Sequence, residues 1–157
     1  MPQKLPLSEF KQIVRLAPLV SIDFVVWSKS GKLLLGRRTN EPAKGQLFVP
    51  GGRIYKGETM AEAFARLAEE ELGLKRQITG SHPLGVYEHM YPNNTFGIQG
   101  FGTHYVVVAF EIFLADELGD LPKSQHSEYT WMTREQTLRH PEVHPNTKAY
   151  LRKKGIH

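Results

Sequence analysis

The segment from Thr59 to Leu72 constrains the fold more than any other part of the sequence, because it is predicted to be a helix with one apolar side. Glu62 follows Thr59 at the spacing of a capping box, and Gly73 supplies a C-terminal cap. Successive side chains turn by about 100° in a helix. This gathers the apolar residues on one side, which we expect to be buried: Met60, Phe64, Leu67 and Ala68, with Leu72 at the margin.

Runs of β-branched and aromatic residues before and after this helix predict strands. They are residues 19–27 and 32–36, joined as a hairpin, residues 46–49, which end at Pro50-Gly51-Gly52, and residues 84–91, 104–114 and 128–132. Shorter helices are expected to be capped by Ser8, Thr133 and Asn146. The sequence therefore predicts an α/β fold, an α/β/α sandwich around a mixed β-sheet. A length of 157 residues fits a single domain, residues 1–157.

Composition and charge narrow the possible functions. The chain has no cysteine, so it offers neither thiolate metal ligands nor a cysteine nucleophile. The net charge is +4, but lysine and arginine are scattered, with one dense run at residues 152–154. We expect no nucleic-acid surface, and instead a few arginines that bind an anionic small molecule. No apolar run reaches the ~18 residues of a membrane span, and no hydrophobic signal region is present at the N-terminus. The expected location is the cytoplasm, without membrane attachment.

Glu71 falls on the apolar side of the predicted helix, seven residues after Phe64 and four after Leu67. An unpaired carboxylate is costly in a core, so Glu71 either escapes to solvent at the last turn or meets a cation. Five acidic residues lie between positions 58 and 71, and negative charge near a helix C-terminus opposes the helix dipole. A divalent cation removes this conflict, and oxygen ligands favour Mg²⁺, with Mn²⁺ as the alternative.

The same residues follow a known spacing. Gly52 and Glu58 precede the run Arg66-Leu67-Ala68-Glu69-Glu70-Glu71-Leu72-Gly73-Leu74. This pattern resembles the Nudix box, Gly-x5-Glu-x7-Arg-Glu-U-x-Glu-Glu-x-Gly-U, in which U is a bulky aliphatic residue. The resemblance over residues 52–74 implies an α/β/α sandwich that binds a divalent metal and hydrolyses a nucleoside diphosphate linked to another group.

Leu67 stands where the Nudix box has a glutamate, so one carboxylate of the usual metal machinery is missing. This departure resembles the GDP-mannose mannosyl hydrolase branch of the family. Segments outside the box share the resemblance, so that it covers nearly the whole chain: residues 18–24, 33–53, 103–108 and 125–131. It implies Mg²⁺-dependent hydrolysis of GDP-mannose, with GDP-glucose as a second candidate, to GDP and free hexose. Water would attack the sugar C1 carbon with inversion.

The resemblance also implies roles for individual residues. Mg²⁺ would be held by Glu71, the side-chain oxygen of Gln125 and the backbone oxygen of Gly51, and His126 would be the general base that activates water. Further catalytic residues around the diphosphate and the departing phosphate would be Arg38, Arg53, Arg66 and Tyr105.

Substrate-binding roles are implied for four more residues, beside Arg38. Asp23 and His89 match two polar positions near the reacting end of the substrate. Leu5 and Phe10 belong to an N-terminal segment that would contact guanine or its ribose, in a homodimer. Asp23 also lies between strand formers, which favours a buried or cleft-facing carboxylate.

Other interpretations stay open. Arg37 and Arg38 follow the same strand, and only one of them can face the site because side chains alternate; the resemblance selects Arg38. Tyr105 fits sheet packing equally well. For the whole chain, one alternative is a Nudix pyrophosphohydrolase that attacks phosphorus and gives a nucleoside monophosphate and a sugar 1-phosphate. Another is a catalytically silent nucleotide-sugar sensor or RNA-binding module.

Overall fold

The structure, a computed structural model, describes residues 3–123 and 125–152. Its strands are β1 (Leu19–Trp27), β2 (Leu33–Arg38), β3 (Leu47–Phe48), β4 (Gly51–Arg53), β5 (His82–Tyr91), β6 (Thr103–Phe113) and β7 (His126–Met132). Its helices are α1 (Leu7–Leu16), α2 (Met60–Leu72), α3 (Arg134–Arg139) and α4 (Pro145–Leu151), with a 3₁₀ turn at Ile78–Gly80. No helix in these ranges has the length and hydropathy that a membrane span requires.

The strands form one mixed sheet in the order β3-β2-β1-β6-β5, with β4 paired to β1 and β7 paired to β2. The parallel pair β1–β6 runs along the whole of β1, and the other pairs are antiparallel. The predicted hairpin between β1 and β2 exists only at its turn, where Trp27 pairs with Leu33. Beyond that point β4, which the sequence analysis missed, lies beside β1, with Gly51 opposite Asp23. The sheet therefore forks between β1 and β2.

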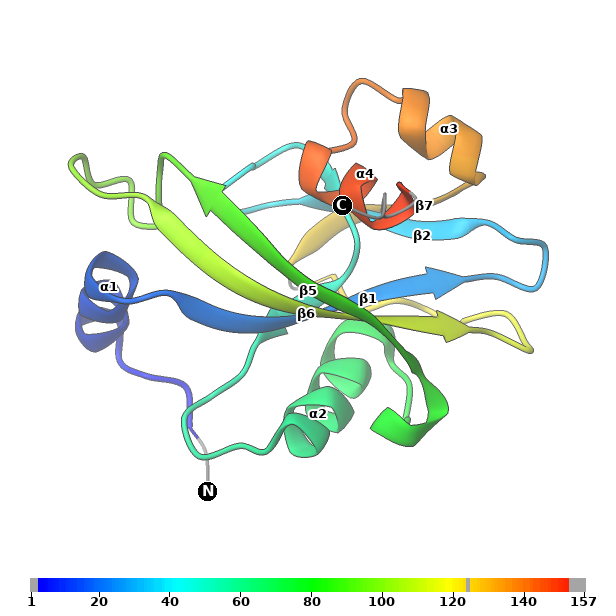
Figure 1. The fold of residues 1–157 in the computed structure, drawn as a ribbon, viewed down its shortest axis with the longest axis horizontal. Helices are drawn as coiled ribbons and strands as arrows, with labels where there is room; N and C mark the ends of the chain where they lie inside the picture. Colours follow the sequence, from blue (N-terminus) through cyan, green and yellow to red (C-terminus); the bar gives the residue numbers. More distant parts are fainter. Residues whose placement is uncertain (1–2, 124, 153–157) are drawn as a thin grey trace, which may run out of the picture.

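Two hydrophobic cores cover the two faces of the sheet. On one face, Phe64 of α2 packs edge-to-face between Phe24 and Phe110, with ring centroids 5.1 and 5.3 Å away. On the other face, Leu151 of α4 joins Leu35 and other strand residues in a second buried cluster. Figure 1 shows α2 below the sheet, with α3 and α4 above it. The predicted α/β/α sandwich is confirmed.

Helix α2 begins and ends as predicted. The backbone N–H of Glu62 donates to the Thr59 hydroxyl at 3.2 Å, and the Thr59 N–H donates to the Glu62 carboxylate at 2.7 Å. Gly73 closes the helix in the left-handed conformation, with φ of 66°. The buried side differs at its first turn, where Met60 is 41% exposed and Ala63 takes its place in the core. The prediction that Met60 is buried was therefore wrong, because the buried side of the first turn includes Ala63 instead of Met60.

The caps of two terminal helices also differ from the prediction. Helix α1 follows Pro6 without any side-chain cap, so Ser8 is not a capping residue. In α4 the ring of His144 accepts a hydrogen bond from the N–H of Asn146 at 3.0 Å, and Pro145 occupies the first turn. Proline fixes the backbone angle needed there and lacks an N–H to satisfy. Thr133 caps α3 as predicted.

Candidate active site

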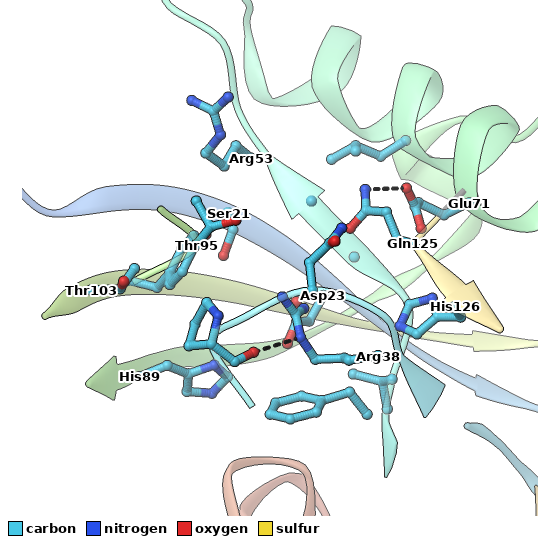
Figure 2. Close-up of a pocket in the computed structure, with 18 of the residues that line it drawn as sticks. Ser21, Asp23, Arg38, Arg53, Glu71, His89, Thr95, Thr103, Gln125 and His126 are labelled. Carbon is cyan, nitrogen blue, oxygen red and sulfur yellow. Dashed lines mark hydrogen bonds between the residues drawn. The ribbon is translucent and has the colours of Figure 1, made fainter. Parts of the chain in front are cut away.

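The fork between β1 and β2 opens into a cavity of about 630 Å³ (Figure 2), a volume typical of small-molecule sites. All the predicted site residues except Leu5 line it, although they come from every part of the chain. Leu5 is 38% exposed and lies outside the cavity, whereas the neighbouring Lys4 lines it. The lining residues that were predicted are Phe10, Asp23, Arg38, Gly51, Arg53, Arg66, Glu71, His89, Tyr105, Gln125 and His126.

Glu71 points inward from the last turn of α2 and is only 3% exposed. The side-chain N–H of Gln125 donates to one of its oxygens at 2.7 Å. Burial, with a smaller contribution from the charge of Glu70, raises the pKa of Glu71 to about 7, against the opposing effect of Arg38 and Arg66. The interpretation in which Glu71 escapes to solvent is therefore wrong, and the carboxylate lies where a cation would stabilise its charge.

The residues around Glu71 fit a hard divalent cation. Glu71, Gln125 and Gly51 all line the cavity and have oxygen atoms that can bind a metal. Mg²⁺ typically takes one or two carboxylates and completes its shell with water and substrate phosphate. Within residues 3–123 and 125–152, no three His, Asp or Glu side chains converge as a metal cluster. The arrangement therefore offers a cation the buried carboxylate of Glu71 rather than a preformed cluster of charged ligands.

Leu67 fills the position of the missing box glutamate with hydrocarbon. It is 2% exposed and belongs to the core beneath α2. A Cβ atom on Gly52 would lie 2.5 Å from a methyl carbon of Leu67, so a larger residue at position 52 would require the Leu67 side chain to move. No charged group replaces the lost carboxylate at this position.

His126 begins β7 opposite Arg38 of β2. It is 1% exposed, and neither ring nitrogen has a hydrogen-bond partner among the described residues. Burial, assisted by the charge of Arg38, lowers the pKa of His126 to about 4. The ring is thus neutral at neutral pH, and one nitrogen is free to accept a proton.

Gly36 of β2 determines where the His126 ring lies. A Cβ atom at position 36 would lie 2.6 Å from Cγ of His126. We expect Gly36→Ala to displace the ring, to cost about 1–3 kcal/mol of unfolding free energy by overpacking and to lower turnover. Denaturant unfolding and steady-state kinetics measure both effects. The control is Gly119→Ala, since a Cβ at Gly119 meets no atom within 4 Å; equal behaviour of the two variants would contradict the prediction.

Two arginines present positive charge to the cavity. Arg38 donates from Nε to the backbone oxygen of Pro42 at 2.9 Å, and the guanidinium of Arg53 stacks 3.8 Å from the Phe10 ring centroid. In the described part of the chain neither forms an ion pair with a carboxylate, so both are available to an anionic ligand. Arg37 instead pairs with Glu128 and Glu142. Because side chains alternate along β2, Arg38 is the arginine that faces the cavity.

Arg66 lines the cavity, but protein acceptors already engage its guanidinium. It pairs with Glu58 and, one helical turn on, with Glu70, and it donates to the backbone oxygen of Arg53 at 2.8 Å. The Glu58 side chain is 4% exposed and holds the loop before α2 through the N–H of Tyr55. Arg66 therefore ties this loop to the helix, and its predicted contact with a diphosphate stays a prediction.

Asp23 and His89, both labelled in Figure 2, also line the cavity, and Asp23 lies opposite Gly51 in the β1–β4 pair. Burial raises the pKa of Asp23 to about 6 and lowers that of His89 to about 4. Both contact the hydroxyl of Tyr150 from α4, a residue that sequence reasoning missed. Tyr105 is half-buried and lines the cavity as well as packing in the sheet. Other lining residues that were not predicted include Tyr91, Thr95 and Thr103.

Known proteins share this sequence pattern and architecture. The NUDIX domain family matches residues 17–153. The chain is 42% identical over 126 residues to the low-salt glycan biosynthesis protein Agl8 of Haloferax volcanii, a match that spans 80% of this chain and 77% of that protein. It is also 42% identical over 72 residues to an ADP-ribose pyrophosphatase of Methanocaldococcus jannaschii, which covers 46% of this chain and 41% of that one.

Solved structures agree on the fold. A MutT Nudix hydrolase from Burkholderia pseudomallei is 25% identical with a TM-score of 0.67, and the match covers 88% of this chain and 98% of that one. The Nudix domain of Shewanella oneidensis NrtR, solved with ADP ribose, is 17% identical with a TM-score of 0.64 over 93% and 95% of the two chains. The family match extends over most of the sequence, and the box folds into the helix that bears Glu71. The chain therefore belongs to the Nudix family of hydrolases.

Proposed function

We propose that this Nudix hydrolase splits a GDP-hexose, GDP-mannose first and GDP-glucose second, into GDP and free hexose. Water attacks the C1 carbon of the sugar and inverts its configuration. The proposal is supported above all by His126, a buried base in the cavity wall beside Gln125 that has no hydrogen-bond partner among the described residues. Leu67, in place of a box carboxylate, adds to this support. The relatives support a related substrate class, since one is named for glycan biosynthesis and another for hydrolysis of ADP-ribose.

Different residues of the cavity bind the two ends of such a substrate, the nucleoside diphosphate and the hexose. Arg38 and Arg53 bind the diphosphate, whose negative charge increases as GDP departs, and fixed positive charge there lowers the barrier. Tyr105, from the same wall, donates to the departing phosphate. Asp23 and His89 bind the hexose, and Phe10, already stacked on Arg53, contacts the nucleoside.

His126 accepts the proton of the attacking water. An inverting reaction needs room for this water on the face of the sugar opposite the leaving group. A neutral imidazole is ready to accept the proton at neutral pH, and the negative diphosphate stabilises the imidazolium that results. Because water is the nucleophile, the absence of cysteine is no obstacle.

Glu71, Gln125 and Gly51 would hold a divalent cation, with Mg²⁺ preferred and Mn²⁺ as the alternative. The ion supplies positive charge to the diphosphate oxygens when it is bound. Gln125 contributes its side-chain oxygen in this role, which requires its amide to turn from the hydrogen bond with Glu71.

Analysis of the reaction products tests this proposal. The purified protein is incubated with GDP-mannose and Mg²⁺, and the products are separated by ion-exchange chromatography. We expect GDP and mannose. GMP and mannose 1-phosphate would instead identify a pyrophosphohydrolase, the usual activity of proteins with a Nudix box. If no product forms, the protein would be a binding module without this activity.

A further inference from the structure

Tyr150 of α4 joins two of the cavity-lining residues from behind the wall. Its hydroxyl donates to Oδ2 of Asp23 at 2.6 Å and lies 3.3 Å from Nε2 of His89. Tyr150 is 5% exposed and does not line the cavity itself. Its hydroxyl therefore reaches a bound molecule through Asp23 and His89, its hydrogen-bond partners among the described residues.

The direction of the hydrogen bond between Tyr150 and Asp23 determines which tautomer of His89 completes the contact. Tyrosine has a single O–H, and the acceptor that receives it is the Asp23 carboxylate. With that proton directed to Asp23, the contact with His89 is a hydrogen bond in the tautomer that carries its proton on Nε2, which leaves Nδ1 as the acceptor. Burial, which lowers the pKa of His89 to about 4, agrees with a neutral ring. The hydrogen bonds thus run from His89 through Tyr150 to Asp23.

Packing holds the Tyr150 ring independently of any ligand. The ring lies edge-to-face on Tyr87, with centroids 4.7 Å apart, and it belongs to the buried cluster formed by α4 and the sheet. Asn146, one turn earlier on α4, donates to the hydroxyl of Tyr91, another lining residue, at 3.2 Å. The core position of α4 therefore sets the orientation of this part of the cavity wall.

We propose that Tyr150 is a positioning residue that sets the hexose specificity of the site, an inference that rests on the proposed function. It fixes Oδ1 of Asp23 and Nδ1 of His89 as acceptors for two hydroxyl groups of the sugar. A sugar without a hydroxyl at either place leaves a buried acceptor unpaired, and sites of this kind reject such analogues strongly.

Tyr150→Phe tests the role, because it removes the hydroxyl and keeps the packed ring. The expected kcat/KM for GDP-mannose falls about 10- to 100-fold, the effect of losing one hydrogen bond to a charged group. The affinity for GDP, which has no hexose, should stay within about twofold, because the Tyr150 hydroxyl contacts Asp23 and His89 and neither of the arginines assigned to the diphosphate. Thr147→Val is the matched control. It removes a buried hydroxyl of the same helix that has no partner among the described residues, and should change neither quantity.

A double-substitution cycle separates positioning from a merely structural role. In an Asp23→Ala background the effect of Tyr150→Phe on kcat/KM should be at least about fivefold smaller than in the wild type, because its main partner is gone. Equal effects in both backgrounds, or a loss of GDP affinity as large as the loss of kcat/KM, would overturn the inference. If Tyr150→Phe alone does not fold, kcat/KM of the double variant is compared with that of Asp23→Ala. A further large loss of kcat/KM in the double variant would also overturn the inference.

The activity of the wild type on GDP-mannose distinguishes a failure of this inference from a failure of the proposed function. A wild type that does not release hexose from GDP-mannose overturns both. A wild type that does so, with kcat/KM unchanged in Tyr150→Phe, overturns the role of Tyr150 alone.

Discussion

Replacing His126 by glutamine is expected to lower the turnover of GDP-mannose by about 10² to 10⁴, because glutamine cannot accept a proton from the attacking water. The binding of GDP should change little, since the His126 ring nitrogens make no hydrogen bond with any described residue. Turnover is measured at saturating substrate, and GDP affinity is measured by calorimetry in the presence of Mg²⁺.

The control for this substitution is His82→Gln. His82 is exposed on β5, where its ring packs against Phe113, and it does not line the cavity. Its replacement should leave both turnover and GDP affinity as in the wild type. Unchanged turnover in His126→Gln would remove this histidine from the mechanism. Parallel losses of turnover and GDP affinity would show a structural role instead.

Glu71→Gln is expected to weaken the binding of Mg²⁺ at least tenfold, an effect of the size seen when groups around a metal are altered (about 10- to 100-fold). Activity should recover in part as the Mg²⁺ concentration is raised. Binding is followed directly by titration with Mn²⁺ and electron paramagnetic resonance. The metal-free variant should also unfold at a higher temperature than the metal-free wild type, because a buried carboxylate is removed.

Glu69→Gln is the matched control for Glu71→Gln. Both residues lie on α2, but Glu69 is exposed and does not line the cavity, whereas Glu71 is buried in its wall. The control should keep the Mg²⁺ affinity of the wild type. Equal metal affinities in the two variants would disprove the assignment of Glu71 as a ligand.

The periodicity of α2 predicted its caps and placed Glu71 on the apolar side, but it left open whether Glu71 is buried or turns to solvent, which the structure decides. Helix geometry fixes which side chains share a face, and both capping interactions join residues three apart, so these features depend on local sequence alone. The same geometry accounts for the ion pair of Arg66 with Glu70, which lies one turn further along the helix. It did not predict the ion pair with Glu58, because Glu58 lies in the loop before the helix.

The cavity depended on features that leave little trace in the sequence. Strand β4 is three residues long, too short for an alternating pattern, yet its pairing with β1 opens the fork. Tyr150 meets Asp23 across 127 positions, and nothing near Tyr150 in the sequence indicates that contact. The resemblance to the mannosyl hydrolase branch selected the lining residues that periodicity alone does not group, such as Arg38 and His126.

Isotope labelling shows most directly which bond of GDP-mannose the protein cleaves. GDP release alone does not settle it, because attack on the terminal phosphorus also gives GDP and free hexose. Hydrolysis of GDP-mannose in ¹⁸O-water is therefore followed by mass spectrometry of both products. Attack at carbon predicts ¹⁸O in mannose and unlabelled GDP. Label in the phosphate of either GDP or GMP would contradict the proposed glycosyl hydrolase mechanism.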